Sequence, residues 1–145
     1  MQLIEMGALS NEEHLSRLRH GVRQVGVKRI LPGGVPGRAT TVSSPNGQQI
    51  WRVALHSTGA AGIRVHFREF SVGNGQVWVY APPSTDPRHS RIAGPYSDKG
   101  LFHDGEFWSA TVNADTVIVE YDAKAGSRSG AVFPPFHIDA ISHQW

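Results

Sequence analysis

Apolar and polar residues alternate along much of this chain, most clearly after residue 50. Residues 51–56 and 63–68 place an apolar side chain at every second position, with polar, charged or small residues between. An alternation with period two is typical of β-strands that bury one face. Further segments of this kind occupy residues 76–81, 92–96, 106–112, 116–121 and 136–142. The pattern predicts roughly seven or eight strands and an all-β fold, an antiparallel β-sandwich or jelly roll.

Two short connections indicate which strands should be neighbours. The link Ser57–Gly62 is short enough to join adjacent strands, and so is the turn Asn113–Asp115. We therefore expect a hairpin at each connection. In the first hairpin, His56 and His66 would face each other on the polar side, where two imidazoles alone make a weak metal site.

The N-terminal region contains a signal for the start of a helix. Ser10 and Glu13 fit a capping box, in which each side chain bonds to the other residue's backbone N–H. The sequence predicts a short N-terminal helix from Asn11 to about His20, ending near Gly21. Its apolar stripe is narrow, so we expect the helix to need contact with the rest of the fold.

A run of proline and glycine divides the chain. Residues 22–31 alternate loosely and predict an edge strand, and the segment Pro32–Gly37 then interrupts regular structure. We expect an N-terminal arm with the short helix at residues 1–37 and a β-sandwich domain at residues 38–145.

Composition excludes several classes of protein. The 145 residues include no cysteine, which excludes disulfide scaffolds, thiolate catalysis and cysteine-based zinc sites. No apolar run reaches about 18 residues, so we expect no membrane-spanning helix. The segment Met1–Leu9 lacks the basic start and apolar core of a signal peptide, which fits a cytosolic chain or one whose signal lies elsewhere.

The net charge of +2 is too small to indicate a nucleic-acid partner. Nucleic-acid binding usually needs a dense basic face, and the basic residues near the N-terminus form only a short cluster. The cluster consists of Arg17, Arg19, Arg23, Lys28 and Arg29. We read it as a solvated segment.

Familiar catalytic motifs are missing from the sequence. It contains no Gly-x-Ser-x-Gly nucleophile elbow and no His-Glu-x-x-His metal motif, so we expect a non-catalytic protein. An enzyme of unfamiliar type would need a concave cluster of titratable groups. The polar strand faces offer one such set, which is Arg52, Arg64, His66 and Arg68.

Three acidic residues mark a candidate calcium site. Asp98, Asp104 and Glu106 lie close together in the sequence and carry the oxygen ligands that Ca²⁺ prefers. Their spacing does not match an EF-hand loop. The alternative is that the aspartates form turns and the glutamate is a surface residue. We expect no other cofactor.

Two aromatic residues on one strand mark a candidate ligand-binding surface. Trp78 and Tyr80 share one face of a predicted strand. If solvent reaches that face, the rings form a platform for a sugar or a protein partner. If a second sheet or the N-terminal arm covers it, they belong to the core, which the apolar character of both faces favours. Trp51 and Trp108 are predicted to be core residues by the same reasoning.

Several short motifs resemble those of a known family. In chain order they are Trp51–Ser57, Gly62–Phe67, Gln76–Tyr80, Gly94–Tyr96 and Gly105–Ser109. Together they resemble the non-catalytic region before the trypsin-like catalytic domain of bacterial secreted peptidases of the lysyl endopeptidase type. The resemblance covers roughly residues 21–143.

The resemblance implies an accessory or pro-region β-sandwich domain of a secreted or cell-envelope serine peptidase. Its partner would be the peptidase catalytic domain, which it helps to fold or covers, or a substrate that it docks. None of the family's catalytic triad positions is carried by this sequence, so no catalytic residue is transferred. The alternative is a carbohydrate-binding jelly-roll module that uses Trp78 and Tyr80. Neither interpretation involves nucleic acid or a membrane.

Overall fold

The computed structural model describes residues 3–9, 26–31, 40–43, 49–82, 92–123 and 134–145. The helix expected at Asn11–His20 and the break at Pro32–Gly37 lie outside these residues. The regular elements in the described ranges are all β-strands: β1 (Leu3–Glu5), β2 (Gly26–Ile30), β3 (Thr40–Ser43), β4 (Gln49–His56), β5 (Gly62–Arg68), β6 (Gly73–Tyr80), β7 (Ile92–Asp98), β8 (Phe107–Trp108), β9 (Thr116–Ala123) and β10 (His137–Gln144). Within those ranges, none of the chain forms a helix that could span a membrane.

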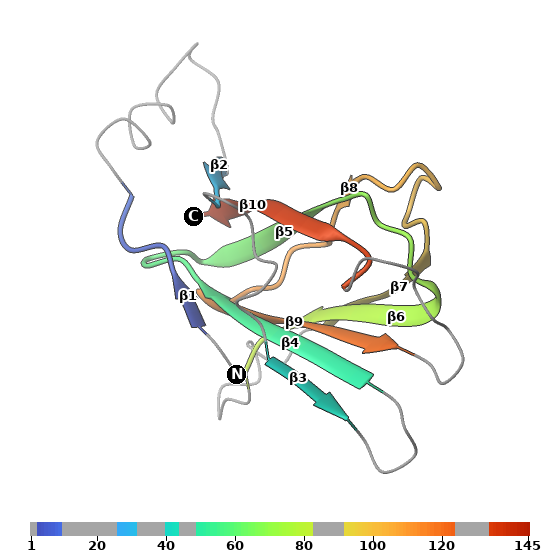
Figure 1. Ribbon diagram of the computed structural model, residues 1–145. Helices are drawn as coiled ribbons and strands as arrows, with labels where there is room; N and C mark the ends of the chain where they lie inside the picture. The colour runs from blue at the N-terminus through green and yellow to red at the C-terminus, as the bar shows by residue number, and fades with distance from the viewer. Residues whose placement is uncertain (1–2, 10–25, 32–39, 44–48, 83–91, 124–133) are drawn as a thin grey trace.

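The strands form two sheets that face each other (Figure 1). Sheet A has the order β1-β4-β9-β6-β7, and β3 pairs with β4 beside β1. Sheet B has the order β2-β10-β5-β8. Only the β1–β4 pair is parallel among the described pairs. The prediction of a sandwich-like all-β fold is therefore confirmed.

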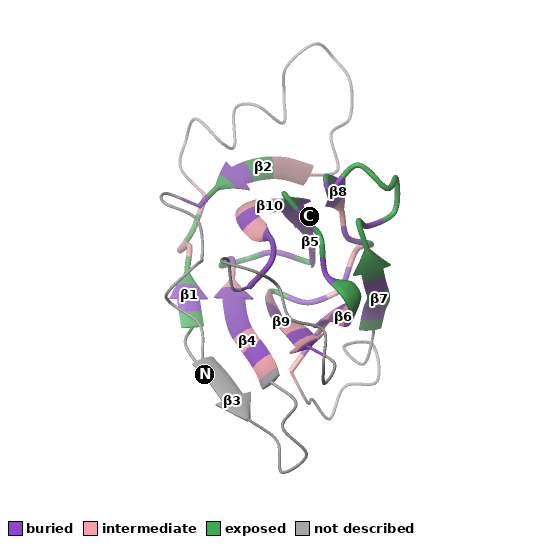
Figure 2. Ribbon diagram, turned by 45° about the vertical axis from the view of Figure 1, so that its right-hand side comes forward, coloured by how far each residue is buried: buried purple, intermediate pink, exposed green. Residues whose placement is uncertain are grey.

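The core lies between the two sheets, because alternate residues of each strand point to the same side. Figure 2 shows the buried positions along the central strands of both sheets. An aromatic group fills the middle of this core, with ring centroids between 4.9 and 5.6 Å apart in each contact. Its members are Phe67, Phe70, Phe107 and Phe136. Burying such rings is the largest favourable contribution to folding.

The hairpins predicted at Ser57–Gly62 and at Asn113–Asp115 are both wrong. The first link passes from β4 in sheet A to β5 in sheet B, and the connection from β8 to β9 also changes sheets. A short link at the end of a sandwich can span the roughly 10 Å between facing sheets. As a result, His56 and His66 lie in different sheets and cannot form a pair across a hairpin.

Of the two tryptophans predicted to be core residues, only Trp51 is buried, with an exposed fraction of 3%. The strand expected at 106–112 is reduced to Phe107–Trp108. Since neighbouring strand residues face opposite sides, the buried Phe107 directs Trp108 to the outer face of sheet B, where it is half-buried.

Residues near the N-terminus contribute strands to both sheets. β1 pairs with the end of β4, and β2 pairs with β10 at the edge of sheet B. The edge strand predicted within residues 22–31 is confirmed. These two short strands thus close one side of the sandwich.

Candidate functional site

The outer face of sheet A gathers polar and aromatic side chains in one row. The register aligns Arg52 of β4 with Glu120 of β9, and Glu120 with Trp78 of β6. Tyr80 lies two residues beyond Trp78 on the same face. Each of these four residues is partly exposed. We call Arg52, Glu120, Trp78 and Tyr80 the sheet A platform.

Glu120 is the hub of the sheet A platform. Its Oε1 accepts a hydrogen bond from Arg52 Nε at 2.8 Å and another from the Tyr80 hydroxyl at 2.9 Å. Partial burial acts to raise the pKa of Glu120, but these hydrogen bonds outweigh it and hold the pKa below its ordinary value. Burial, followed by the bond to Glu120, raises the pKa of Tyr80 to about 12. Glu120 is therefore ionised and Tyr80 neutral near pH 7.

Trp78 and Tyr80 lie on the outer face of sheet A, so the core placement that the apolar character of both strand faces favoured is wrong. Val77 and Val79 of the same strand are fully buried in the core, so the two aromatic residues must face outward. Both remain partly exposed beside charged groups, an arrangement suited to stacking and hydrogen bonding with a ligand. Binding of a ligand here stays a prediction.

Of the predicted calcium site, Asp98 is the last residue of β7, and Asp104 and Glu106 lie in the loop between β7 and β8. Their carboxylates, however, contact different partners. Asp98 lies 3.8 Å from His103 Nδ1, Asp104 Oδ1 accepts a bond from the Glu106 backbone N–H at 3.0 Å, and Glu106 Oε1 lies 3.2 Å from His66 Nε2. Within the described residues, no group of three or more histidine, aspartate or glutamate side chains is arranged to hold a metal ion. Calcium binding stays a prediction, and the contacts themselves match turn and surface roles.

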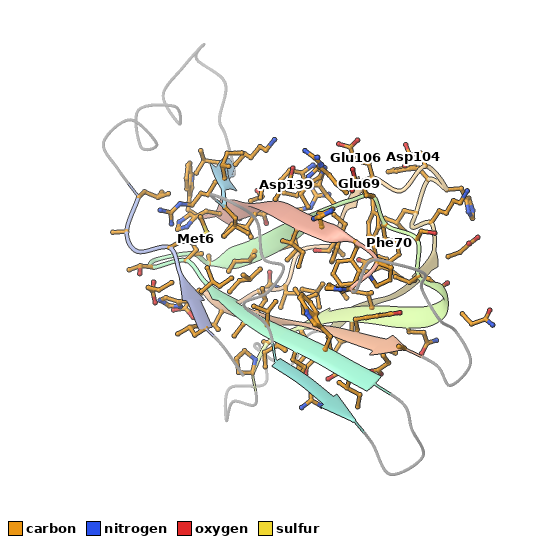
Figure 3. The ribbon with its side chains drawn as sticks, viewed as in Figure 1. Met6, Glu69, Phe70, Asp104, Glu106 and Asp139 are labelled. Atoms are coloured by element: carbon orange, nitrogen blue, oxygen red, sulfur yellow. The ribbon has the colours of Figure 1, made fainter. Side chains whose placement is uncertain are left out.

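The outer face of sheet B carries a second polar group centred on His66. Its Nδ1 lies 2.6 Å from Asp139 Oδ1, and its ring centroid lies 4.7 Å from that of Trp108. Arg64 lies over the Trp108 ring, with its guanidinium carbon 5.8 Å from the ring centroid. Figure 3 shows Asp139 and Glu106 on the outer side of sheet B.

Sequence reasoning named Arg64, His66 and Arg68 but missed Asp139. The pairing of β10 with β5 shifts register between Ile138 and Ala140, so Asp139 sits at a β-bulge. The bulge interrupts the alternation and turns Asp139 toward His66. Arg68 Nη1 lies 3.5 Å from Asp139 Oδ2, so the carboxylate contacts both His66 and Arg68. Arg52, the fourth residue of the predicted catalytic set, lies on the other sheet.

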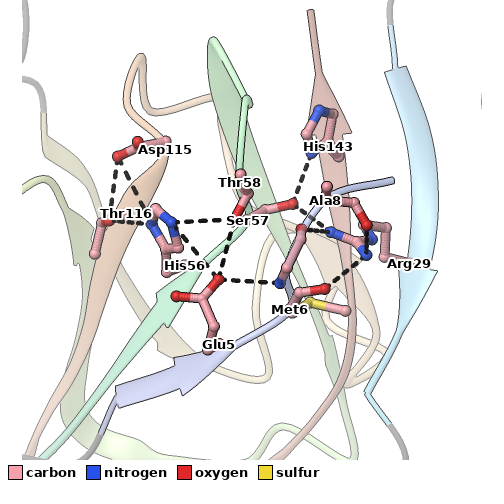
Figure 4. Close-up of polar contacts among 11 residues, drawn as sticks. Glu5, Met6, Ala8, Arg29, His56, Ser57, Thr58, Asp115, Thr116 and His143 are labelled. Atoms are coloured by element: carbon pink, nitrogen blue, oxygen red, sulfur yellow. Dashed lines mark hydrogen bonds and ion pairs between the residues drawn. The ribbon is translucent and has the colours of Figure 1, made fainter. Parts of the chain in front are cut away.

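A third polar group, with buried side chains, lies where the segment after β1 meets β2 and the end of β4 (Figure 4). Arg29 Nη1 donates to Gly7 O and to Ser57 Oγ, both at 2.9 Å, and Nη2 donates to Met6 O at 2.8 Å and Ala8 O at 3.4 Å. We call this group the Arg29 clamp. It ties the segment after β1 to sheet B, so the predicted role of Arg29 as a solvated residue is wrong.

The Arg29 clamp also contains a serine beside a histidine. Ser57 Oγ lies 2.6 Å from His143 Nδ1, a contact that resembles the nucleophile and base of a serine hydrolase. Ser57 and His143 are only 0% and 2% exposed, and the guanidinium of Arg29 donates a hydrogen bond to the serine oxygen. The geometry thus fits a structural polar junction.

The chain was also compared with known proteins. No protein-family model matches it, and no curated protein matches it.

Proposed function

We propose that this chain is a non-catalytic accessory or pro-region domain that binds the trypsin-like catalytic domain of a secreted or cell-envelope serine peptidase. The sequence motifs that resemble such regions support the choice of a peptidase catalytic domain as the partner. Its action would be to assist folding of the catalytic domain or to cover its cleft.

One observation carries the non-catalytic part of this proposal: each polar group described above is bonded within the fold. Glu120 binds Arg52 and Tyr80, His66 lies between Asp139 and Glu106, and Ser57 joins Arg29 to His143. Substrate must also be able to reach a reactive group, and Ser57, His66 and His143 are all buried. The arrangement supports a rigid scaffold that acts through its surface.

The experiment adds the purified chain to a trypsin-like catalytic domain of the bacterial lysyl endopeptidase type. We expect a complex on size-exclusion chromatography, slower hydrolysis of a lysyl chromogenic substrate, or a higher yield when the denatured peptidase is refolded with the chain. An unrelated β-sandwich protein at equal concentration is the control. If complex, inhibition and refolding yield all equal the control, the proposal is wrong.

The sheet A platform supports a second candidate, a carbohydrate-binding jelly-roll module. Trp78 and Tyr80 offer ring faces, and Arg52 and Glu120 offer a donor and an acceptor for sugar hydroxyls. Calorimetry with soluble oligosaccharides, with and without Ca²⁺, would test it. Binding that Trp78→Ala abolishes would favour this module, whereas acrylamide failing to quench Trp78 fluorescence would count against it.

A further inference from the structure

We propose that the end of β7 and the loop that follows it, residues 98–106, form the surface through which this chain docks on its partner. Leu101 and Phe102 at its tip would enter an apolar recess that lysine or arginine side chains flank. The inference deepens the proposed function and rests on it for the identity of the partner, a peptidase catalytic domain.

The tip of this loop exposes two adjacent large apolar side chains. Leu101 is 55% exposed and Phe102 is 71% exposed. Figure 2 shows the loop as an exposed segment beside β8. The other described large apolar residues that are exposed, Leu3, Ile30 and Ile92, lie singly on three different strands. Leucine and phenylalanine at one protruding point form the kind of anchor that central pockets of protein interfaces accept.

Backbone hydrogen bonds close the loop at its base. The N–H of Gly105 donates to Lys99 O at 2.9 Å, and the N–H of Gly100 donates to Ser97 O at 3.0 Å. Two further bonds attach the loop to the segment after β5, from Phe70 N to Gly105 O and from Val72 N to Asp98 O, both at 2.9 Å. Phe70 itself is buried between the sheets (Figure 3), so the loop is fastened to the core.

The backbone of the loop is also held in an unusual conformation. Asp98 and His103 have φ angles of +53° and +59°, values that residues other than glycine rarely adopt. Gly100 has a φ of +86° and lies against the Phe107 ring, where an added Cβ would be 2.4 Å from the nearest ring atom. Strained positions of this kind are found at binding sites, and a loop already ordered loses little entropy on binding.

The charge of the loop indicates the character of its partner. Asp98, Asp104 and Glu106 carry three negative charges against the single positive charge of Lys99, and Asp98, Asp104 and Glu106 are all exposed. An acidic rim around an apolar tip complements a basic rim around an apolar recess. The same acidic rim would be repelled by an anionic membrane surface, so a protein partner is favoured over lipid.

The experiment measures affinity of the full chain for the catalytic domain used above, by surface plasmon resonance. We compare the natural chain with Leu101→Ser/Phe102→Ser and with the matched control Leu3→Ser/Ile30→Ser. We expect the loop variant to bind at least about tenfold more weakly and the control to bind normally. Asp98→Asn/Glu106→Gln should bind less tightly and lose part of the salt dependence of association. Circular dichroism and thermal unfolding verify that each variant is folded.

Each outcome decides a different claim. If the natural chain binds and the loop variant binds equally well, the docking surface is wrong and the proposed function stands. If the natural chain neither binds, inhibits nor assists refolding, both proposals fail. If the natural chain binds vesicles of phosphatidylcholine and phosphatidylserine and Leu101→Ser/Phe102→Ser does not, the loop is a membrane contact and our inference is overturned.

Discussion

Arg29 and Arg52 carry the same guanidinium group but differ in how deeply they are buried and in how many acceptors they bind. Arg29 is 7% exposed and donates to a serine oxygen and three backbone carbonyls, whereas the Arg52 side chain is 43% exposed and donates to one carboxylate. Arg29 connects segments of both sheets, and Arg52 connects two neighbouring strands of one sheet. The guanidinium group suits both tasks, because its planar donors can bind several acceptors at once.

The comparison teaches that burial, and not the number of charges, decides how much a polar group contributes to the stability of the fold. An unpaired buried acceptor loses its water without replacement, which makes the loss of its donor costly. At the surface, water takes over when a donor is removed, and exposed ion pairs contribute little. We therefore expect the Arg29 clamp to control stability and the sheet A platform to tolerate change.

The largest expected effect comes from Arg29→Met. The variant keeps the apolar stem but leaves Ser57 Oγ and the carbonyls of residues 6–8 without this donor, so the free energy of unfolding should fall by roughly 3 kcal/mol. Urea denaturation would measure it. Arg52→Met is the matched control, with an expected loss of at most about 1 kcal/mol. Equal losses in the two variants would remove the distinction between the two regions.

Ser57→Ala tests the centre of the Arg29 clamp with a smaller change. It deletes the oxygen shared by Arg29 and His143 and should lower the free energy of unfolding by about 2 kcal/mol. Thr58→Ala, one residue away and exposed, is the control and should change stability only slightly. A wild-type unfolding curve for Ser57→Ala would mean that the clamp is redundant.

Glu120→Gln removes the charge of the sheet A platform and preserves its shape. The free energy of unfolding should fall by about 1 kcal/mol or less at neutral pH. The pKa of Glu120 is lowered in the folded protein, so its contribution is present above the ordinary value of 4.5 and is lost as the pH falls through the lowered pKa. The difference between natural chain and variant should accordingly vanish in acid, measured by urea denaturation across the acidic range. A difference that grows in acid would contradict the assignment.

The smallest expected effect is a shift in the pH at which Tyr80 ionises, seen by ultraviolet absorbance. The pKa of Tyr80 is raised to about 12, so its hydroxyl should ionise well above the ordinary value of 10. The favourable contribution of its neutral form is present below pH 10 and is lost as the pH rises through 12. Ultraviolet titration of Tyr80→Phe against the natural chain isolates this step. In Glu120→Gln the step should move to lower pH, because the bond to an ionised carboxylate is gone; an unmoved step would mean that burial alone sets it.

The candidate site was only partly visible in the sequence. Trp78 and Tyr80 were found because period two separates them from Val77 and Val79, but the apolar character of both strand faces favoured core positions for these partly exposed residues. Glu120, their partner on β9, was missed because nothing local indicates that β9 lies between β4 and β6. Leu101 and Phe102 were missed because an exposed apolar pair in a loop looks like a short core segment until its surroundings are known.

The amino-acid sequence by itself indicated most of the strands, because alternation of apolar and polar side chains is a local property with a period of two. It also indicated which face of β4 and β5 lies in the core. Only the tertiary structure decided which strands pair, that two short links cross between sheets, and that Arg29 is buried while Arg52 is not. Those outcomes depend on contacts between residues far apart in the chain, such as Arg29 with Ser57, and no local pattern encodes them.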